Sequence, residues 1–198
     1  MRIITGSARG RRLTAPDEQV RCFDFSTALK TLPGTDVTRP TVARVKEGMF
    51  SALQFDIEGR RGLDLFAGTG QMGLEAISRG AKSVTFVESG RPSLEALRAN
   101  IAACGFTEQC KVFAMDALRF LKIGGGEYDV AFIDPPYNQG LAQAALPLVA
   151  QQMASGGVIL CETDRHEEMP QEVGNFRLIK TRRYGKAMIH TYRIPEEE

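Results

Sequence analysis

The chain has 198 residues, of which 43% are hydrophobic and 25% charged, with a formal net charge of +1. These proportions suit one globular domain with an extension and exclude a disordered or fibrous chain. No apolar run approaches the roughly 18 residues of a membrane span, and the N-terminus lacks the apolar stretch of a signal peptide, so we expect a soluble, cytoplasmic protein without a membrane partner.

The N-terminal part of the chain is basic. Residues 1–46 hold nine basic and four acidic side chains, a balance that suits a polyanionic partner or, equally, a solvated face. Arg2 to Thr5 and Arg11 to Thr14 predict a small hairpin, whereas residues 17–38 have no clear pattern. A helix is expected from Pro40 to Leu53, and residues 1–55 are therefore predicted to be an extension outside the main domain.

From residue 61 onward, short apolar runs alternate with helical patterns, which is typical of a parallel sheet covered by helices. The predicted strands are Gly62–Phe66, Ser83–Glu88, Lys111–Met115, Tyr128–Asp134 and Val158–Glu162. The predicted helices are Gln71–Ser78, Pro92–Ala103, Ala117–Leu121 and Leu141–Met153. Phe176–Thr181 and Met188–Ile194 suit a closing antiparallel pair. Residues 56–198 are therefore predicted to form a doubly wound α/β domain around a mostly parallel, seven-stranded sheet.

A glycine-rich turn follows the first predicted strand. The run from Asp64 to Gly73 reads Asp-Leu-Phe-Ala-Gly-Thr-Gly-Gln-Met-Gly, and glycines between a strand and a helix let the backbone bend sharply and a ligand lie against it. Gly68, Gly70 and Gly73 also have the spacing of dinucleotide-binding proteins. The turn alone therefore fits a nicotinamide dehydrogenase or a purely structural connection as well.

Three carboxylates favour S-adenosylmethionine over a dinucleotide. Asp64 suits the cationic amino end of a methionine better than a pyrophosphate, which it would repel. We expect Glu88, at the end of the second strand, to accept ribose hydroxyls. Asp116, after the third strand, would accept the adenine amino group, although it is also well placed as a helix N-cap. The predicted cofactor-binding residues are Asp64, Phe66, Ala67, Gly68, Thr69, Gly70, Glu88, Asp116, Ala117 and Asp134.

The fourth strand runs into Asp134-Pro135-Pro136-Tyr137, which in isolation is a strand-ending turn. After a cofactor turn it predicts methyl transfer to an exocyclic base amine. The Asp134 carboxylate and the Pro135 carbonyl would accept the hydrogens of the amine and aim its lone pair at the sulfonium methyl. Pro135 and Pro136 stiffen the backbone, and Tyr137 offers a ring for an extruded base. These four residues are the predicted catalytic residues, and the reaction needs no metal.

The nature of the base is less sharply defined. Guanine presents two adjacent donors, N1–H and the 2-amino group, which one carboxylate can accept together. Asp134 therefore favours guanine, although Asp also serves adenine-specific enzymes. The four cysteines form no CxxC pair and have no histidine at metal-binding spacing, so we expect them to be reduced and structural and predict no metal site.

Taken together, these motifs resemble those of the RsmD-type bacterial (guanine-N2)-methyltransferases of small-subunit (16S) ribosomal RNA. The resemblance covers nearly the whole chain. The matching motifs are Arg9-Gly10-Arg11-Arg12-Leu13, Arg39-Pro40-Thr41 with Arg44-Val45-Lys46-Glu47, the run from Asp64 to Gly70, Gly73-Leu74-Glu75-Ala76, Asp134-Pro135-Pro136-Tyr137 and Tyr184-Gly185. The segment from Asp17 to Thr38 is longer than usual in the family, and Ala43 stands where an Asp is common.

The resemblance implies a Rossmann-like class I S-adenosylmethionine methyltransferase fold with a small N-terminal hairpin and helix extension. It also implies a monomer that methylates N2 of a guanosine, guanine 966, within an assembled or assembling small subunit. The extension would then contact RNA phosphates through basic side chains lying outside the catalytic fold. The predicted RNA-binding residues are Arg9, Arg11, Arg12, Arg39 and Arg44.

Two other functions share parts of this pattern. A DNA methyltransferase acting on adenine N6 or cytosine N4 would have the same cofactor turn and tetrapeptide, but about 60 residues ahead of the catalytic domain are few for a target-recognition domain. A non-catalytic RNA-binding assembly factor could keep the fold without turnover. Intact Asp134, Pro135 and Tyr137 favour an enzyme over that alternative.

Overall fold

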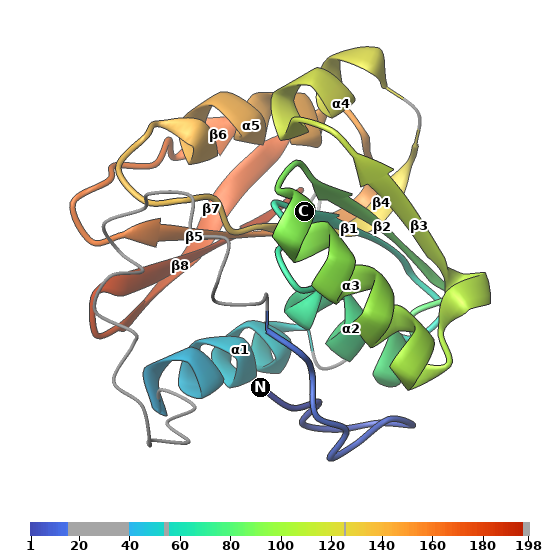
Figure 1. Cartoon of the computed structure of the whole chain (residues 1–198). Coiled ribbons are helices and arrows are strands. Elements are labelled where there is room, and N and C mark those ends of the chain that lie inside the picture. The colour runs from blue at the N-terminus through green and yellow to red at the C-terminus, as the bar shows by residue number, and fades with distance from the viewer. Residues whose placement is uncertain (16–39, 54–55, 125, 196–198) are drawn as a thin grey trace.

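The fold is built on one central sheet, seen in a computed structural model that describes residues 1–15, 40–53, 56–124 and 126–195 (Figure 1). Of residues 40–44 it describes the backbone only. The described strands follow the order β3-β2-β1-β4-β5-β8-β7-β6. Five of them are parallel: β1 (Arg61–Leu65), β2 (Ser83–Glu88), β3 (Cys110–Ala114), β4 (Tyr128–Ile133) and β5 (Met153–Asp164).

Three antiparallel strands complete the sheet beyond β5. They are β8 (Ala187–Arg193), β7 (Phe176–Tyr184) and the two-residue β6 (Glu172–Val173). The doubly wound, mostly parallel sheet is therefore confirmed. All seven predicted strands are present, and β6 is an eighth that was not predicted, because two residues carry too little pattern to be recognised.

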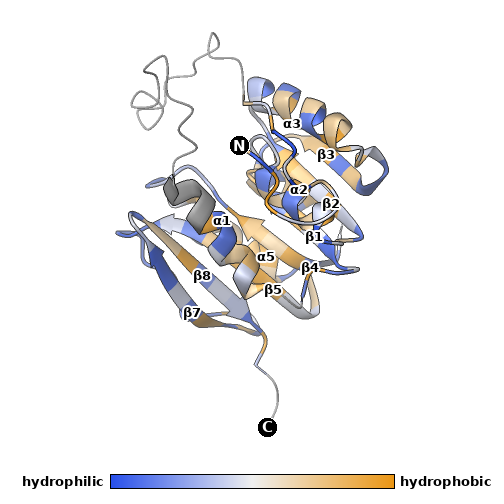
Figure 2. Ribbon diagram, turned by 90° about the horizontal axis from the view of Figure 1, so that it is seen from below, coloured by the Kyte–Doolittle hydropathy of each residue, from blue (hydrophilic) through white to orange (hydrophobic). Residues whose placement is uncertain are grey.

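Helices cover both faces of the sheet. One face packs against α1 (Pro40–Ala52), α2 (Gln71–Ser78) and α3 (Arg91–Cys104), and the other against α4 (Ala117–Ile123) and α5 (Leu141–Ala150). Within β4, Val130 and Phe132 join the first core while Ala131 and Ile133 join the second. Successive side chains of a strand point to opposite faces, so a strand buried on both sides is apolar throughout. Figure 2 shows this apolar centre in β4 and β5.

The C-terminal part of α5 was assigned wrongly from the sequence. The helix was predicted to run from Leu141 to Met153, but it ends at Ala150, and Met153 begins β5. That strand was predicted to start at Val158. Gly156, with φ +74°, and Gly157 interrupt the apolar alternation of its first half, so the residues before Val158 did not resemble a strand.

The N-terminal segment, residues 1–15, packs against the main domain. The predicted hairpin is reduced to one antiparallel bridge between Arg2 and Arg12. Ile3 and Leu13 are 2% and 4% exposed and join the same core as Met49 of α1 and Leu74 of α2. The predictions for residues 17–38 and for Arg39 lie outside the described residues. No helix in the described part of the chain is long and apolar enough to cross a membrane.

Candidate active site

The glycine-rich turn connects β1 to α2. Phe66, Gly68 and Gly70 have φ values of +64°, +54° and +81°, in the left-handed region that costs a residue other than glycine about 1 kcal/mol or more. The Ala67 amide donates to the Val87 carbonyl at 2.9 Å, and the Gly70 amide donates to the Ala67 carbonyl at 2.8 Å. The turn is therefore tight and fastened to the end of β2.

The three glycines of the turn have different surroundings. A Cβ atom on Gly70 would lie 2.4 Å from Cδ1 of Leu97, and one on Gly73 would lie 2.3 Å from Cε1 of Phe86. Gly70 therefore lets the turn pack closely against α3, and Gly73 lets α2 pack closely against β2. A Cβ on Gly68 would meet no heavy atom within 4 Å, so Gly68 marks an open face of the turn against which a ligand can lie.

Asp64 lies beneath this turn as a buried carboxylate. It is 2% exposed and accepts a hydrogen bond from the Gly73 amide at 2.8 Å. Burial, reinforced by the nearby charge of Glu88, raises its pKa to about 7. None of the described basic side chains forms an ion pair with Asp64, so its carboxylate would gain most from a cation brought by a ligand.

Glu88 joins two loops at the carboxyl end of β2. One carboxylate oxygen accepts from the Gly68 amide at 2.7 Å and the other from the Gly90 amide at 2.6 Å. A carboxylate has about four acceptor positions, so both oxygens can still accept hydroxyl donors. Glu88, the residue expected to accept the ribose hydroxyls, therefore also holds the cofactor turn in place.

Asp116 is the N-cap of α4, as one of the two interpretations of the sequence held. Its exposed side chain accepts from the Arg119 amide at 2.8 Å, and Ala117 behind it is buried. Met115 donates its amide to the Glu88 carbonyl at 3.0 Å. The two carboxylates thus follow neighbouring strands, and the proposed adenine contact of Asp116 stays a prediction.

The tetrapeptide lies beside the cofactor turn. β1 and β4 are neighbours with Leu65 paired to Ile133, so the turn and Asp134 leave the sheet side by side at the same edge. Asp134 and Pro136 are exposed, whereas Pro135 is buried. This juxtaposition brings the predicted cofactor-binding and catalytic residues together.

Tyr137 is fixed by a residue that the sequence analysis missed. Its hydroxyl donates a hydrogen bond to Glu162 of β5, while the side chain stays 37% exposed. Burial raises the pKa of the tyrosine far above its usual range, and the negative charge of Glu162 adds to this. Burial also raises the pKa of Glu162, which the hydrogen bond from Tyr137 partly offsets. The signal in the sequence was the position of Glu162 near the carboxyl end of the fifth parallel strand.

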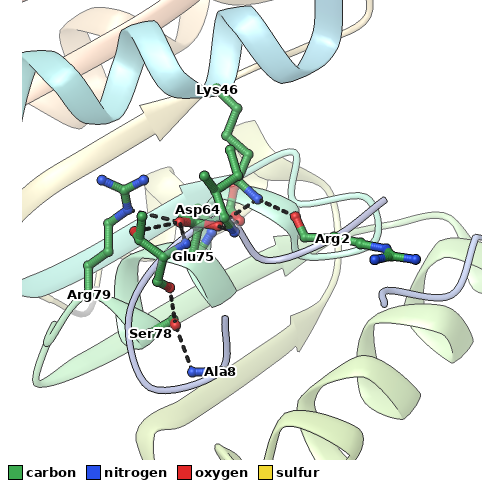
Figure 3. A network of polar contacts seen from close by, with 10 residues as sticks. Arg2, Ala8, Lys46, Asp64, Glu75, Ser78 and Arg79 are labelled. Atoms are coloured by element: carbon green, nitrogen blue, oxygen red, sulfur yellow. Dashed lines mark hydrogen bonds and ion pairs between the residues drawn. The ribbon is translucent and has the colours of Figure 1, made fainter. Parts of the chain in front are cut away.

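A buried polar network fastens the N-terminal segment to α1 and α2 (Figure 3). Glu75 of α2 is fully buried, and its carboxylate lies 2.8 Å from Nζ of Lys46. It also accepts from the amides of Ile4 at 2.7 Å and Thr5 at 3.0 Å. Because Glu75 follows Gly73 by two residues, the network begins directly behind the cofactor turn.

A second bridge reaches the turn from α3. The buried Asn100 side chain accepts from the Thr14 amide at 2.7 Å. It donates to the carbonyls of Thr14 at 3.0 Å and Thr69 at 3.1 Å. Residue 69 belongs to the cofactor turn, so Asn100 links Thr14 of the N-terminal segment to the candidate site.

The predicted RNA-binding arginines are only partly placed. Arg9, Arg11 and Arg12 are exposed, and Nη1 of Arg11 donates to the carbonyl of Ala103 near the end of α3. Arg39 and the side chain of Arg44 lie outside the described residues. Within the described ranges, no group of three His, Cys, Asp or Glu residues is arranged to hold a metal ion.

The chain is similar in sequence and in structure to known proteins. The family described as Conserved hypothetical protein 95 matches residues 26–193. YlbH of Bacillus subtilis (strain 168) is 33% identical over 198 residues, covering 98% of both chains. Ribosomal RNA small subunit methyltransferase D of Escherichia coli (strain K12) is 31% identical over 194 residues, covering 97% of this chain and 89% of that protein. The solved structure of yhhF from Escherichia coli has a TM-score of 0.80 at 29% identity and covers 100% of this chain and 99% of its own.

Proposed function

Because the chain belongs to the family described as Conserved hypothetical protein 95, the RsmD type, we propose that it transfers a methyl group from S-adenosylmethionine to N2 of a guanosine in small-subunit (16S) ribosomal RNA. The relative named Ribosomal RNA small subunit methyltransferase D supports an rRNA substrate. The family resemblance and the fit of Asp134 to two adjacent donors support the guanine-N2 specificity. Guanine 966 as the target is supported by the family resemblance alone.

The observation that carries this proposal is the pairing of Leu65 with Ile133. Because of this pairing, the turn that carries Gly68 and the tetrapeptide that begins with Asp134 leave the sheet at the same edge, where a methyl donor on the turn and an amine at the tetrapeptide would meet. Ligands of open α/β sheets bind at this edge. A dinucleotide fits the turn less well, because a pyrophosphate would lie near the buried Asp64 carboxylate.

The residues present fit S-adenosylmethionine. Asp64 would hold the cationic amino end, Glu88 the ribose hydroxyls, and Asp116 with Ala117 the adenine, while the backbone from Phe66 to Gly70 would line the methionine. Bound there, the cofactor supplies a methyl group on a positively charged sulfur. No metal takes part in the proposed reaction.

The protein's own contribution is to position the amine. The Asp134 carboxylate and the Pro135 carbonyl accept its two hydrogens, which turns the nitrogen lone pair toward the methyl group. Pro135 and Pro136 hold that backbone in place. Tyr137, fixed through its hydroxyl by Glu162, presents its ring to the extruded base. The amine nitrogen would bond to the methyl carbon as the sulfur–carbon bond breaks, which would leave a neutral thioether, and the nitrogen would then give up one proton to water.

The test offers labelled S-adenosylmethionine together with three substrates in parallel: naked small-subunit ribosomal RNA, isolated small subunits and DNA. We expect label in RNA at N2 of a single guanine, mapped by nuclease digestion and mass spectrometry. Assembled or assembling small subunits should be the better substrate, and the enzyme should be a monomer. Label in DNA alone would contradict the proposal. Binding of S-adenosylmethionine without transfer to any substrate would support a non-catalytic assembly factor instead.

A further inference from the structure

Four basic side chains gather at the edge of the sheet that carries the candidate site. Tyr184, the last residue of β7, pairs with Ala187 of β8, and Ala187 pairs with Asp164 at the carboxyl end of β5. The turn between β7 and β8 therefore lies at the same edge as Asp134 and Glu162. The side chains at this turn and directly after β5 are named here the hairpin cluster: Arg165, Arg182, Arg183 and Lys186.

The register of the sheet fixes the distance of this cluster from the site. Glu162 pairs with Ile189, and Ile189 pairs with Arg182, so the three lie in one row across β5, β8 and β7. Neighbouring strands are about 4.8 Å apart, which puts the backbone of Arg182 about 10 Å from that of Glu162. Arg165 belongs to the same group, because its amide donates to the Lys186 carbonyl at 2.9 Å.

The positive charges of the cluster are not neutralised by ion pairs with the described residues. Arg165, Arg183 and Lys186 are exposed and Arg182 is half-buried. None of the four forms an ion pair with a described residue. Arg183 donates to the Gly185 carbonyl at 3.0 Å, and Arg165 donates to the His166 ring at 2.9 Å. Figure 2 shows part of β7 in the hydrophilic colour, separated by β8 from the apolar centre of the sheet.

The acidic side chains nearest the cluster already accept backbone donors. Asp164 accepts from the His166 amide at 3.1 Å. Glu167 accepts from the amides of Asn138 at 3.1 Å and Asp164 at 3.2 Å. These carboxylates hold the loops around the tetrapeptide, which leaves the cations for an anion from outside.

The N-terminal arginines lie at the other edge of the sheet. α2 and α3 start at the carboxyl edge and run back across the sheet, and the tip of the segment, residues 7–11, meets their far ends: the Ser7 amide donates to the Ser78 carbonyl at 2.8 Å, and Arg11 donates to the Ala103 carbonyl. Figure 1 shows this segment in blue beneath α2 and α3, away from the turn between β7 and β8. Its tip is therefore far from Asp134.

We infer that the hairpin cluster binds the RNA phosphates that flank the target nucleotide. The inference rests on the proposed function, which brings an RNA base to Asp134. Phosphates adjoining that base must pass over the rim of the site, where these four cations stand, and arginine suits phosphate because its fork donates two parallel hydrogen bonds. The N-terminal arginines would contact only RNA farther from the target.

The test compares two triple variants of the full chain. In the first, Arg182, Arg183 and Lys186 are changed to Ala. In the matched control, the exposed Lys82, Lys111 and Lys122, at the amino ends of β2 and β3 and the end of α4, are changed to Ala, so that both variants lose three positive charges. Affinity for small-subunit ribosomal RNA and for isolated small subunits is measured against salt concentration, with S-adenosylmethionine affinity as the control for folding.

We expect the hairpin variant to bind RNA about tenfold more weakly at low salt and to lose about 2 from the slope of log affinity against log salt, because each phosphate contact contributes about 0.7 to 0.9. The control should keep most of the wild-type slope. A variant with Arg182→Lys and Arg183→Lys keeps the charge and should retain most of the binding, which separates charge from folding of the turn.

Three outcomes would overturn the inference. An equal loss in both triple variants would mean that only net charge matters. Wild-type affinity and slope in the hairpin variant would place the phosphates elsewhere. A third triple variant, with Arg9, Arg11 and Arg12 changed to Ala, is measured in the same way, and a loss confined to it would place the phosphates on the N-terminal segment. These outcomes differ from failure of the proposed function, in which the wild-type protein transfers no methyl group to ribosomal RNA and the reason for RNA at this rim disappears.

Discussion

The hydroxyl of Tyr137 donates a hydrogen bond to the carboxylate of Glu162, which joins the loop after β4 to the end of β5. The bond fixes the tilt of a ring that is otherwise partly exposed. A hydrogen bond to a charged acceptor contributes about 1.5 to 3 kcal/mol. The candidate base-stacking residue is thus held by a positioning residue.

We expect Glu162→Ala to lower kcat/KM for RNA about tenfold or more while leaving S-adenosylmethionine affinity near the wild-type value. Glu162→Gln keeps an acceptor for Tyr137 and should recover most of the loss. Steady-state kinetics and calorimetry provide both readouts. If Tyr137→Phe and Glu162→Ala had fully additive effects in the double variant, the bond between them would not be what matters.

Asp134 should be needed for transfer and not for cofactor binding. Asp134→Ala removes an acceptor for the target amine, and the loss of one preorganised polar contact lowers the rate about 100-fold or more. Single-turnover methylation with saturating RNA measures this, with cofactor affinity as the control. Turnover at the wild-type rate would remove Asp134 from the proposed mechanism.

Most residues of the candidate site lie at the ends of strands, and the sequence allowed these strand ends to be predicted. Asp64, Glu88, Asp116 and Asp134 were predicted from their places at the carboxyl ends of successive strands, and the parallel sheet brings such places to one edge. Strand ends can be located in a sequence because a strand buried on both faces is a run of apolar residues, and the chain turns where that run ends. Glu162 is near such an end as well, but no local motif distinguished it from an ordinary polar residue.

Contacts between distant parts of the chain could not be predicted in this way. Glu75 looked like one more helical residue after the turn, yet it is fully buried and binds the amides of Ile4 and Thr5, about seventy residues earlier. Its partners depend on how the N-terminal segment packs against α2, which no periodicity within either segment encodes. The sequence therefore predicted an N-terminal extension outside the main domain, whereas residues 1–15 of it pack against that domain.

The ion pair between Lys46 and Glu75 should matter for stability. Removing one member of a buried pair costs about 3 to 5 kcal/mol, because the other charge stays buried without its partner. Glu75 keeps Arg79, whose Nε lies 2.9 Å away, so we expect Lys46→Met to lower the free energy of unfolding by about 3 kcal/mol. Urea unfolding measures this, with the exposed Lys82→Met as control. An unchanged midpoint would show that Arg79 and the amides suffice for Glu75.

Glu88 should contribute to cofactor affinity in two ways. Its carboxylate is the expected ribose acceptor, and it also holds the Gly68 and Gly90 amides. Glu88→Ala should therefore weaken S-adenosylmethionine binding by about 1.5 to 3 kcal/mol. Glu88→Gln can still accept a hydrogen bond from one amide, so its affinity for S-adenosylmethionine should lie between those of wild type and Glu88→Ala. Unchanged affinity in a folded Glu88→Ala protein, measured by calorimetry, would place the ribose elsewhere, and tighter binding of NAD would contradict the methyltransferase proposal as a whole.

Asp64 predicts how stability depends on pH. Its folded pKa of about 7 lies above the ordinary 3.8, so between these values the folded protein holds a proton that the unfolded chain has lost. The Asp64 contribution to the free energy of unfolding therefore falls as pH rises from about 4 to about 7. Asp64→Asn cannot titrate but can still accept from the Gly73 amide. The variant should gain stability relative to wild type between pH 5 and pH 8 in urea unfolding, and a constant difference would contradict the raised pKa.

The same carboxylate predicts a proton released on cofactor binding. A cationic amino group beside Asp64 would favour the ionised form and lower its pKa, so near pH 7 binding should expel the proton that the empty site holds. Calorimetry in two buffers with different ionisation enthalpies detects this as a difference in the apparent binding enthalpy. Asp64→Asn should abolish the difference while keeping the fold. If the wild-type enthalpy were the same in both buffers, the amino end of S-adenosylmethionine would not be held by Asp64, and the turn would have to bind the methionine through its backbone alone.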